Sequence, residues 1–241
     1  MFDPAQFDRK ADFRGVYPNE INEELAWFAG RYLAQAVKEL TDQQAPRIAV
    51  ARDGRTSSPA IYSAVIQGIG AEGAVAVPTG LCTSDMIQWI VGYKGEDENL
   101  REVIAGAMIT ASHNPPEYNG IKMCCWNHAD NTLDILRPVD HFKSRYEADG
   151  ADGTAFVPGQ TAPFPKQARL ELQEKFVKVA CARSERIAGF EGKIVLDPGN
   201  GVGGILRRLL KDELHSRGAT DKMEILEVAG HIDGSFPTRP S

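Results

Sequence analysis

The chain has 241 residues, of which 42% are hydrophobic and 25% are charged, and its net charge is -6. It shows no basic excess of the kind that binds nucleic acid, and no run of about 18 apolar residues that could span a membrane. Because the N-terminal residues are charged where a signal peptide has its apolar core, we expect a cytoplasmic protein that binds neither nucleic acid nor membrane.

The first part of the chain alternates predicted helices and strands. Apolar residues at helical spacing predict a helix over 22–40, for which Asn22 is a suitable N-cap. Strands that alternate with helices at this spacing indicate an α/β fold with a mixed, mostly parallel sheet. The predicted strands cover 47–51, 74–77, 103–109 and 120–125, and the further helices cover 59–71, 84–93 and 139–147.

A stretch rich in Gly, Pro and Ala over 148–165 has no periodicity, and it predicts a linker or domain boundary. After this stretch the alternation of strands and helices begins again, but only in part. Its elements are a helix over 166–182, a strand over 193–196, a helix over 202–215 and a strand over 223–228. We therefore expect one complete domain over 1–155 and a second, incomplete α/β domain of similar type over 156–241.

The four cysteines are too few and too scattered for a disulfide framework. Cys124, Cys125 and His128 lie close enough in the sequence to suggest a set of metal ligands. Adjacent residues of a strand point to opposite faces, however, which argues against shared ligation by the two cysteines. We expect reduced thiols that hold no metal.

The segment over 108–122, MITASHNPPEYNGIK, carries the densest chemistry in the chain. It follows a predicted buried strand, and open α/β sheets place ligands at the carboxyl ends of such strands. Its Asn-Pro, Pro-Pro and Asn-Gly pairs are turn formers. Within it lie a hydroxyl, an imidazole, an amide and an ammonium group, on Ser112, His113, Asn114 and Lys122.

Ser112 does not resemble a serine-hydrolase nucleophile, because the sequence around it, with Ala111 and His113 as its neighbours, contains no G-x-S-x-G elbow. In an extended backbone His113 would also point away from the Ser112 hydroxyl. Two interpretations stay open on the residues alone. In the first, Ser112 carries a phosphoryl group, which would need cations and amide donors around it. In the second, the segment is a polar turn without a catalytic serine.

The segment from Thr110 to Lys122 resembles the active-site serine loop of the α-D-phosphohexomutases, the phosphomannomutase/phosphoglucomutase superfamily. The resemblance extends over nearly the whole chain, in the order of the family's motifs. The other matching segments are DFRG at 12–15, ARDGRTSSP at 51–59, PTG at 78–80, VLDPGNGVGG at 195–204 and DGSFP at 233–237.

This resemblance implies a three-layer α/β/α sandwich and a phosphoserine mutase that moves a phosphoryl group between the 1- and 6-positions of a mannose or glucose phosphate. Ser112 would carry the phosphoryl group, and Mg²⁺ would bind to Ser112 through that group. Lys122 would transfer a proton or stabilise charge near the sugar hydroxyl. Arg14 would approach Ser112, and His113 and Asn114 would shape the loop.

The chain also departs from the family pattern. Ala11 replaces the aromatic residue before the first motif, and the D-G-D-G-D-R segment that supplies aspartate ligands to the metal is not in this sequence. We expect an N-terminal piece of a longer chain, or a natural short product, that needs the C-terminal domains of its parent as partners. The resemblance therefore implies negligible mutase activity for these 241 residues alone.

A rival interpretation starts from the glycines over 199–204, which satisfy G-x-G-x-x-G after a predicted strand and before a predicted helix. An acidic residue, Asp197, precedes them and would repel a pyrophosphate. The alternatives are a nucleotide site, which would make the chain a non-catalytic phosphate- or nucleotide-binding module, and a tight strand-to-helix turn.

Overall fold

The structure is a computed structural model that describes residues 2–93, 98–149, 166–182 and 189–238. The chain divides into two compact units, Met1–Phe164 and Pro165–Ser241. The predicted domain boundary between residues 155 and 156 lies outside the described residues. Among the described residues, no helix combines the length and apolar character needed to cross a membrane.

The first unit contains the strands that the site depends on, and one buried strand lies at its centre. All seven residues of that strand, β4, are buried. The elements in chain order are η1 (Pro4–Asp8), β1 (Phe13–Val16), α1 (Glu23–Thr41), β2 (Arg47–Arg52), α2 (Ser58–Ala71), β3 (Val75–Leu81), α3 (Ser84–Val91), α4 (Glu98–Arg101), β4 (Val103–Ile109), β5 (Tyr118–Asn127), β6 (Thr132–Ile135), α5 (Pro138–His141) and α6 (Lys143–Asp149).

The six strands form one sheet in the order β1-β5-β4-β2-β3, with β6 paired to β5. β2 runs parallel to β3 and β4, whereas β5 runs antiparallel to β1, β4 and β6. The predicted mixed sheet is confirmed. Its parallel part is limited to three strands, because β5 returns from β4 through a short hairpin, and only antiparallel strands can be joined in that way.

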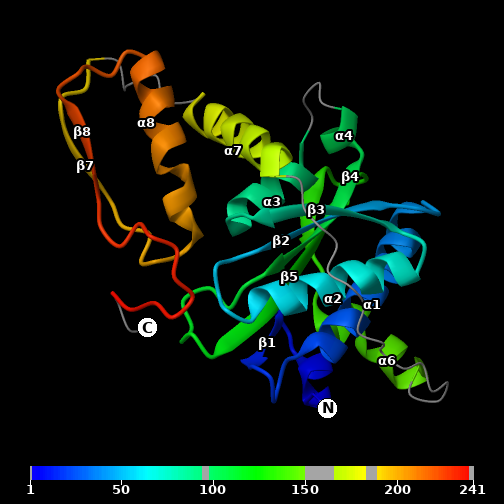
Figure 1. Cartoon of the computed structure of the whole chain (residues 1–241). Coiled ribbons are helices and arrows are strands. Elements are labelled where there is room, and N and C mark those ends of the chain that lie inside the picture. Colours follow the sequence, from blue (N-terminus) through cyan, green and yellow to red (C-terminus); the bar gives the residue numbers. More distant parts are fainter. Residues whose placement is uncertain (1, 94–97, 150–165, 183–188, 239–241) are drawn as a thin grey trace. The chain divides into compact units, whose positions relative to one another are not determined.

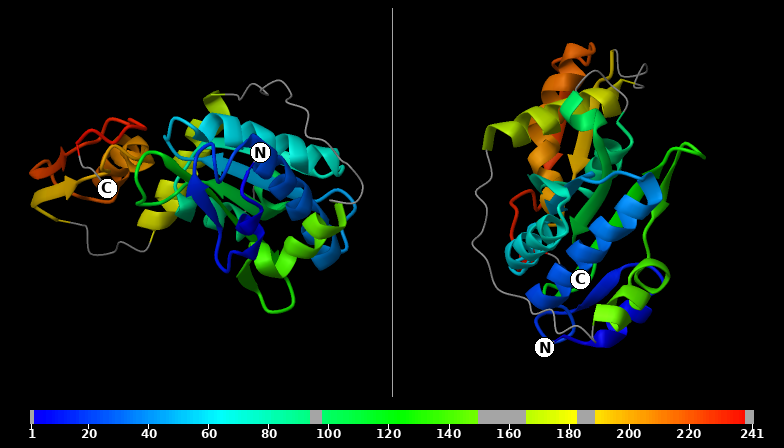
Figure 2. Two further views of the ribbon diagram at one scale, coloured as in Figure 1. Left: turned by 90° about the horizontal axis from the view of Figure 1, so that it is seen from below. Right: turned by 90° about the vertical axis from the view of Figure 1, so that its right-hand side faces the viewer.

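Helices cover both faces of this sheet, which confirms the three-layer sandwich. α1 and α2 lie side by side across one face, and α3 lies on the other (Figure 1; Figure 2). Strand residues alternate between the faces, as the period of two requires. Cys125 joins the core under α1, while its neighbour Cys124 lines a pocket on the α3 side. The two thiols thus point to opposite faces, as predicted.

Helix α1 begins as the sequence predicts. The Asn22 Oδ1 atom accepts the N–H of Leu25 at 3.1 Å, and this cap satisfies one of the first donors of the helix. Helices α1 and α2 then cross in backbone contact at two glycines. A Cβ atom on Gly30 would lie 2.3 Å from the Val65 oxygen, and one on Gly68 would lie 2.1 Å from the Trp27 oxygen.

The predicted elements differ from the structure in several places of the first unit. The sequence patterns miss β1, β6 and α4, because an element of four residues carries too little periodicity to be recognised. The single helix expected over 139–147 is two short helices, α5 and α6, which are separated at the fully buried Phe142. β3 extends beyond the predicted 74–77 to Leu81, past a register shift in its pairing with β2.

The second unit is a small α/β arrangement. Its elements are α7 (Lys166–Cys181), β7 (Gly192–Leu196), η3 (Val202–Leu206), α8 (Arg207–Ser216) and β8 (Met223–Glu227). β7 and β8 are parallel, and β8 alternates buried and exposed residues at Met223 to Ile225. The helix predicted over 202–215 begins as the 3-10 turn η3, since Gly203 and Gly204 are poor formers of an α-helix.

The glycine contact between α1 and α2 generates a test of the packing. Gly30→Ala and Gly68→Ala should each lower the free energy of unfolding by about 1–3 kcal/mol, because each added methyl group meets rigid backbone. Urea denaturation followed by circular dichroism measures the change. Gly70→Ala is the matched control, since its Cβ would have nothing within 4 Å. A control loss as large as the others would contradict the packing argument.

Candidate active site

The serine loop, residues 110–117, is the hairpin that joins β4 to β5. Thr110 donates its N–H to the Gly120 oxygen at 3.0 Å and closes the base of the loop. Its hydroxyl oxygen then accepts the N–H of Ser112 at 2.9 Å. Ser112 has φ 57°, in the left-handed region, so the expectation of an extended backbone there is wrong. Ser112 and His113 are both exposed at this corner.

One buried guanidinium holds the loop from its inner side. Arg55 is 1% exposed. It donates to four main-chain oxygens of the hairpin, with lengths between 2.6 and 3.1 Å. The accepting residues are Ser112, Asn114, Pro115 and Tyr118. Because a guanidinium presents its donors in a rigid planar fork, these four contacts fix the path of the loop around a single group.

Asp53 and three further polar residues hold Arg55 in turn. Asp53 accepts the Nε–H of Arg55 at 3.1 Å through one carboxylate oxygen. The other oxygen accepts the Arg55 main-chain N–H and the Ser58 hydroxyl. Asn119 donates to the hydroxyl oxygens of Ser57 and Ser58. Burial lowers the pKa of Arg55, and the charge of Asp53 acts against that shift, so a protonated guanidinium is retained.

None of these supporting residues was among the predicted site residues. All of them except Asn119 lie in ARDGRTSSP at 51–59, a segment that resembles a family motif but for which the resemblance implied no residue roles. One signal in the sequence could have placed them near the site. Charged residues follow the apolar strand over 47–51, and the carboxyl end of this strand lies at the same sheet edge as the carboxyl end of β4. Sequence alone does not say that Arg55 turns inward.

Arg14 lies beside the serine loop, on the antiparallel strand β1. It donates to the Ala111 oxygen at 3.0 Å and to Asn114 Oδ1 at 3.2 Å, so it contacts residues on both sides of Ser112. Both of these contacts come from its Nη1 atom, and its Nη2 atom pairs with the Asp12 carboxylate at 2.5 Å. Asn114 also donates its N–H to the Ala111 oxygen, which closes the turn. The roles of both residues toward a phosphoryl group stay predictions.

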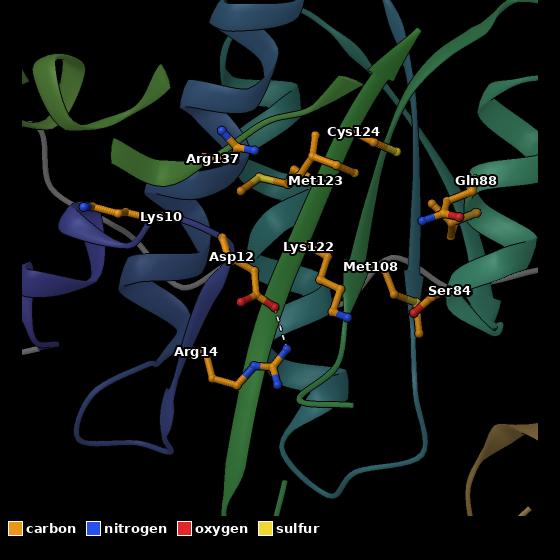
Figure 3. A pocket seen from close by; sticks show the side chains of 13 residues that line it. Lys10, Asp12, Arg14, Ser84, Gln88, Met108, Lys122, Met123, Cys124 and Arg137 are labelled. Atoms are coloured by element: carbon orange, nitrogen blue, oxygen red, sulfur yellow. Dashed lines mark hydrogen bonds and ion pairs between the residues drawn. The ribbon is translucent and has the colours of Figure 1, made fainter. Parts of the chain in front are cut away.

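Lys122 and Arg14 line a pocket of about 490 Å³ on the α3 side of the sheet. Figure 3 shows Lys122 between the Asp12–Arg14 pair and Ser84 of α3. Ala11, which stands where the family has an aromatic residue, also lines this pocket. The ammonium and guanidinium groups give the pocket the charge that a phosphate group requires.

The described residues do not supply a complete site for the expected Mg²⁺. They contain no group of three or more His, Cys, Asp or Glu side chains close enough to hold a metal ion. Mg²⁺ prefers several oxygen ligands, whereas the side chains that hold the loop around Ser112 include the two guanidinium groups of Arg55 and Arg14.

The glycine loop at 199–201 has the geometry of a tight turn. Gly199 donates its N–H to Asp197, Asn200 donates to the Ala229 oxygen, and Gly201 donates to the Pro198 oxygen. A phosphate cradle needs these amides to be free for the ligand. The loop also leads into η3 rather than into the first turn of an α-helix. Both observations favour the interpretation as a turn over a nucleotide site.

The left-handed backbone at Ser112 generates a stability prediction. Ser112→Gly should be more stable than Ser112→Ala by about 1 kcal/mol, because glycine alone adopts positive φ without a steric cost. Chemical denaturation of the two variants gives the difference directly. If Ser112→Ala were the more stable of the two, the left-handed conformation would be wrong.

The buried thiols of β5 generate a prediction about cysteine reactivity. Burial raises the pKa of Cys124 to about 12 and that of Cys125 to about 11. Since only the thiolate attacks a disulfide reagent, we expect both to react at about pH 8 at least about 100-fold more slowly than in the unfolded chain, and faster as the pH rises. Reaction with an aromatic disulfide, with peptide mass mapping, measures the two rates in native and denaturing buffer. Equal rates in the two buffers would contradict burial.

Comparison with known proteins supports an assignment to a family. Residues 5–135 match the family described as phosphoglucomutase/phosphomannomutase, alpha/beta/alpha domain I. A phosphomannomutase/phosphoglucomutase of Pseudomonas aeruginosa is 28% identical over 97% of this chain, and a probable phosphoglucosamine mutase of Thermococcus kodakarensis is 28% identical over 92%. The chain spans 44% and 43% of the length of these two relatives.

Solved structures agree with this match. A phosphoglucomutase/phosphomannomutase family protein from Burkholderia thailandensis superimposes with a TM-score of 0.72 and 26% identity, covering 100% of this chain and 47% of that one. A putative phosphomannomutase from Thermus thermophilus has the same fold, with a TM-score of 0.69 at 20% identity. With a serine loop held between Arg55 and Arg14 at the end of β4, the chain belongs to the phosphoglucomutase/phosphomannomutase family.

Proposed function

We propose that this chain is the phosphoryl-carrying part of a phosphohexomutase, in which Ser112 takes up and returns the phosphoryl group of a hexose phosphate. The observation that carries the proposal is the exposure of the Ser112 hydroxyl at the corner of a loop that Arg55 and Arg14 hold from within and from the side. A plain polar turn would need no buried guanidinium behind it, since burying a charge is costly.

The proposed chemistry is an in-line transfer. A sugar hydroxyl oxygen attacks phosphorus, the bond from phosphorus to the Ser112 oxygen breaks, and the hydroxyl proton ends on that serine oxygen. A second transfer in the opposite sense returns the other phosphoryl group of the sugar to Ser112. Lys122, which lines the pocket, would stabilise charge on the transferred oxygens or pass the proton.

The substrate class is hexose phosphates. The relatives that match at 28% identity are named for mannose, glucose and glucosamine phosphates, so the names support the class rather than one sugar. Mg²⁺ is proposed for a longer protein, where it would neutralise charge on the phosphoryl oxygens. We propose that the partners of this chain are the C-terminal domains of its parent, which would supply the carboxylate ligands for the metal.

The second candidate is a non-catalytic module that binds phosphate without forming a covalent bond. The cationic pocket beside Lys122 and Arg14 favours this candidate independently of Ser112 chemistry. Covalent uptake of phosphate distinguishes the two candidates.

Prolonged incubation of the 241-residue chain with Mg²⁺ and glucose 1,6-bisphosphate should therefore slowly add about 80 Da to the protein, localised to Ser112, because this residue is exposed and a single transfer to it requires no turnover. Intact-mass and peptide mass spectrometry measure the adduct. Ser112→Ala is expected to show none, and an equal adduct on that variant would contradict the assignment.

Steady-state interconversion of glucose 1-phosphate and glucose 6-phosphate by the chain alone should stay far below the ~1 s⁻¹ of an ordinary enzyme, because no described group completes the metal site. A coupled assay for glucose 6-phosphate tests this with the same preparation. A rate in the ordinary range would overturn the proposal that further domains are required.

A further inference from the structure

We infer that the peptide N–H of His113, and not its imidazole, binds the phosphoryl group on Ser112, and that Arg55 is the positioning residue that turns this N–H outward. The inference rests on the proposed function of Ser112. It adds a binding group in the main chain and gives a role to a buried residue that touches no substrate. Three observations on the serine loop lead to it.

The first observation concerns the peptide between Ser112 and His113. Arg55 donates to the Ser112 oxygen at 3.0 Å, so this carbonyl points inward to the buried guanidinium. In a trans peptide the C=O and N–H bonds point in opposite directions. The His113 N–H therefore points away from Arg55, toward the exposed side of the loop, where Ser112 and His113 meet solvent.

The second observation concerns the neighbouring amides. Ser112 donates its N–H to Thr110 Oγ1 at 2.9 Å, and Asn114 donates its N–H to the Ala111 oxygen at 3.0 Å. Both donors are used within the loop. Among the amides of residues 112–114, the His113 N–H is the one that donates to no acceptor within the described residues, so it is free for a ligand on the exposed side of the loop.

The third observation is the inward direction of four carbonyl groups. Arg55 also binds the oxygens of Asn114, Pro115 and Tyr118. Carbonyl oxygens turned outward would repel a phosphoryl dianion. By binding these oxygens, the guanidinium keeps them on the inner side of the loop, away from its exposed side. A lysine in its place would keep the charge, but it has three donors on one atom and no planar fork to reach four oxygens.

The test uses the full chain with phosphoserine incorporated at position 112 during synthesis, so it does not depend on any transfer reaction. In the isotope-labelled protein, phosphorylation should move the His113 amide proton downfield and create a scalar coupling between the His113 nitrogen and the phosphorus. The shift should reverse as the pH falls through about 6, where the phosphate takes up a proton. Absence of both signals in the unsubstituted protein overturns the inference.

Arg55→Lys and Arg55→Gln should each abolish the downfield shift and the coupling in protein that circular dichroism shows to be folded. Arg31→Lys is the matched control, since Arg31 is also largely buried and pairs with Glu72 and Asp149 away from the loop. The control should keep both signals. Folded Arg55 variants that keep them would overturn the role of Arg55, and the unsubstituted protein alone decides whether His113 donates.

If the phosphoserine signals appear as expected but glucose 1,6-bisphosphate adds no phosphate to Ser112, the proposed function fails while the inference about His113 stands. If glucose 1,6-bisphosphate phosphorylates Ser112 but the phosphoserine protein shows neither signal, the proposed function stands and the inference about His113 fails.

Discussion

The buried pairing of Arg55 with Asp53 is the interaction on which the serine loop depends. A charge in the interior is tolerated only when it is paired and its donors are satisfied, and here the hairpin itself supplies the acceptors. The loop and the arginine are therefore stable only together. Removing the guanidinium would take one hydrogen bond from Asp53 and one from each of four main-chain oxygens, which links the conformation of Ser112 to the core of the first unit.

This arrangement explains how the loop holds a residue in a strained conformation. Ser112 has φ 57°, in the left-handed region, and the loop must keep a fixed shape around it. Strain of this kind persists only where the surroundings determine the backbone from several directions. Thr110 holds the loop at its base, Arg55 from within, and Arg14 from the side. The loop thereby has a fixed shape, which is the condition that the proposed phosphoryl transfer needs for electrostatic stabilisation.

The sandwich sets where these groups can meet. β2 and β4 are parallel neighbours, so the segments that follow them, one with Asp53 and Arg55 and the other with Ser112, leave the sheet at the same edge. β5 returns antiparallel and brings Lys122 opposite Met108, on the face that lines the pocket. The described residues thus place the cationic side chains of Lys122 and Arg14 in one pocket, and Arg14 also contacts the loop that exposes Ser112. This chain spans 44% of the Pseudomonas aeruginosa relative, and we propose that the carboxylates which complement these cations lie elsewhere in a longer protein.

The sequence by itself determined the α/β class, the principal helices and the serine loop after a buried strand, because periodicity, the Asn22 cap and turn formers are local signals. It also placed Ser112, His113 and Asn114 in one segment. Only the tertiary structure decided that the backbone at Ser112 is left-handed, that β1 brings Arg14 to the loop, and that Arg55 lies beneath it. Residues 55 and 112 are far apart in the chain, and their contact depends on strand order and burial. Neither property has a local pattern, since a buried arginine and an exposed one look alike in a sequence.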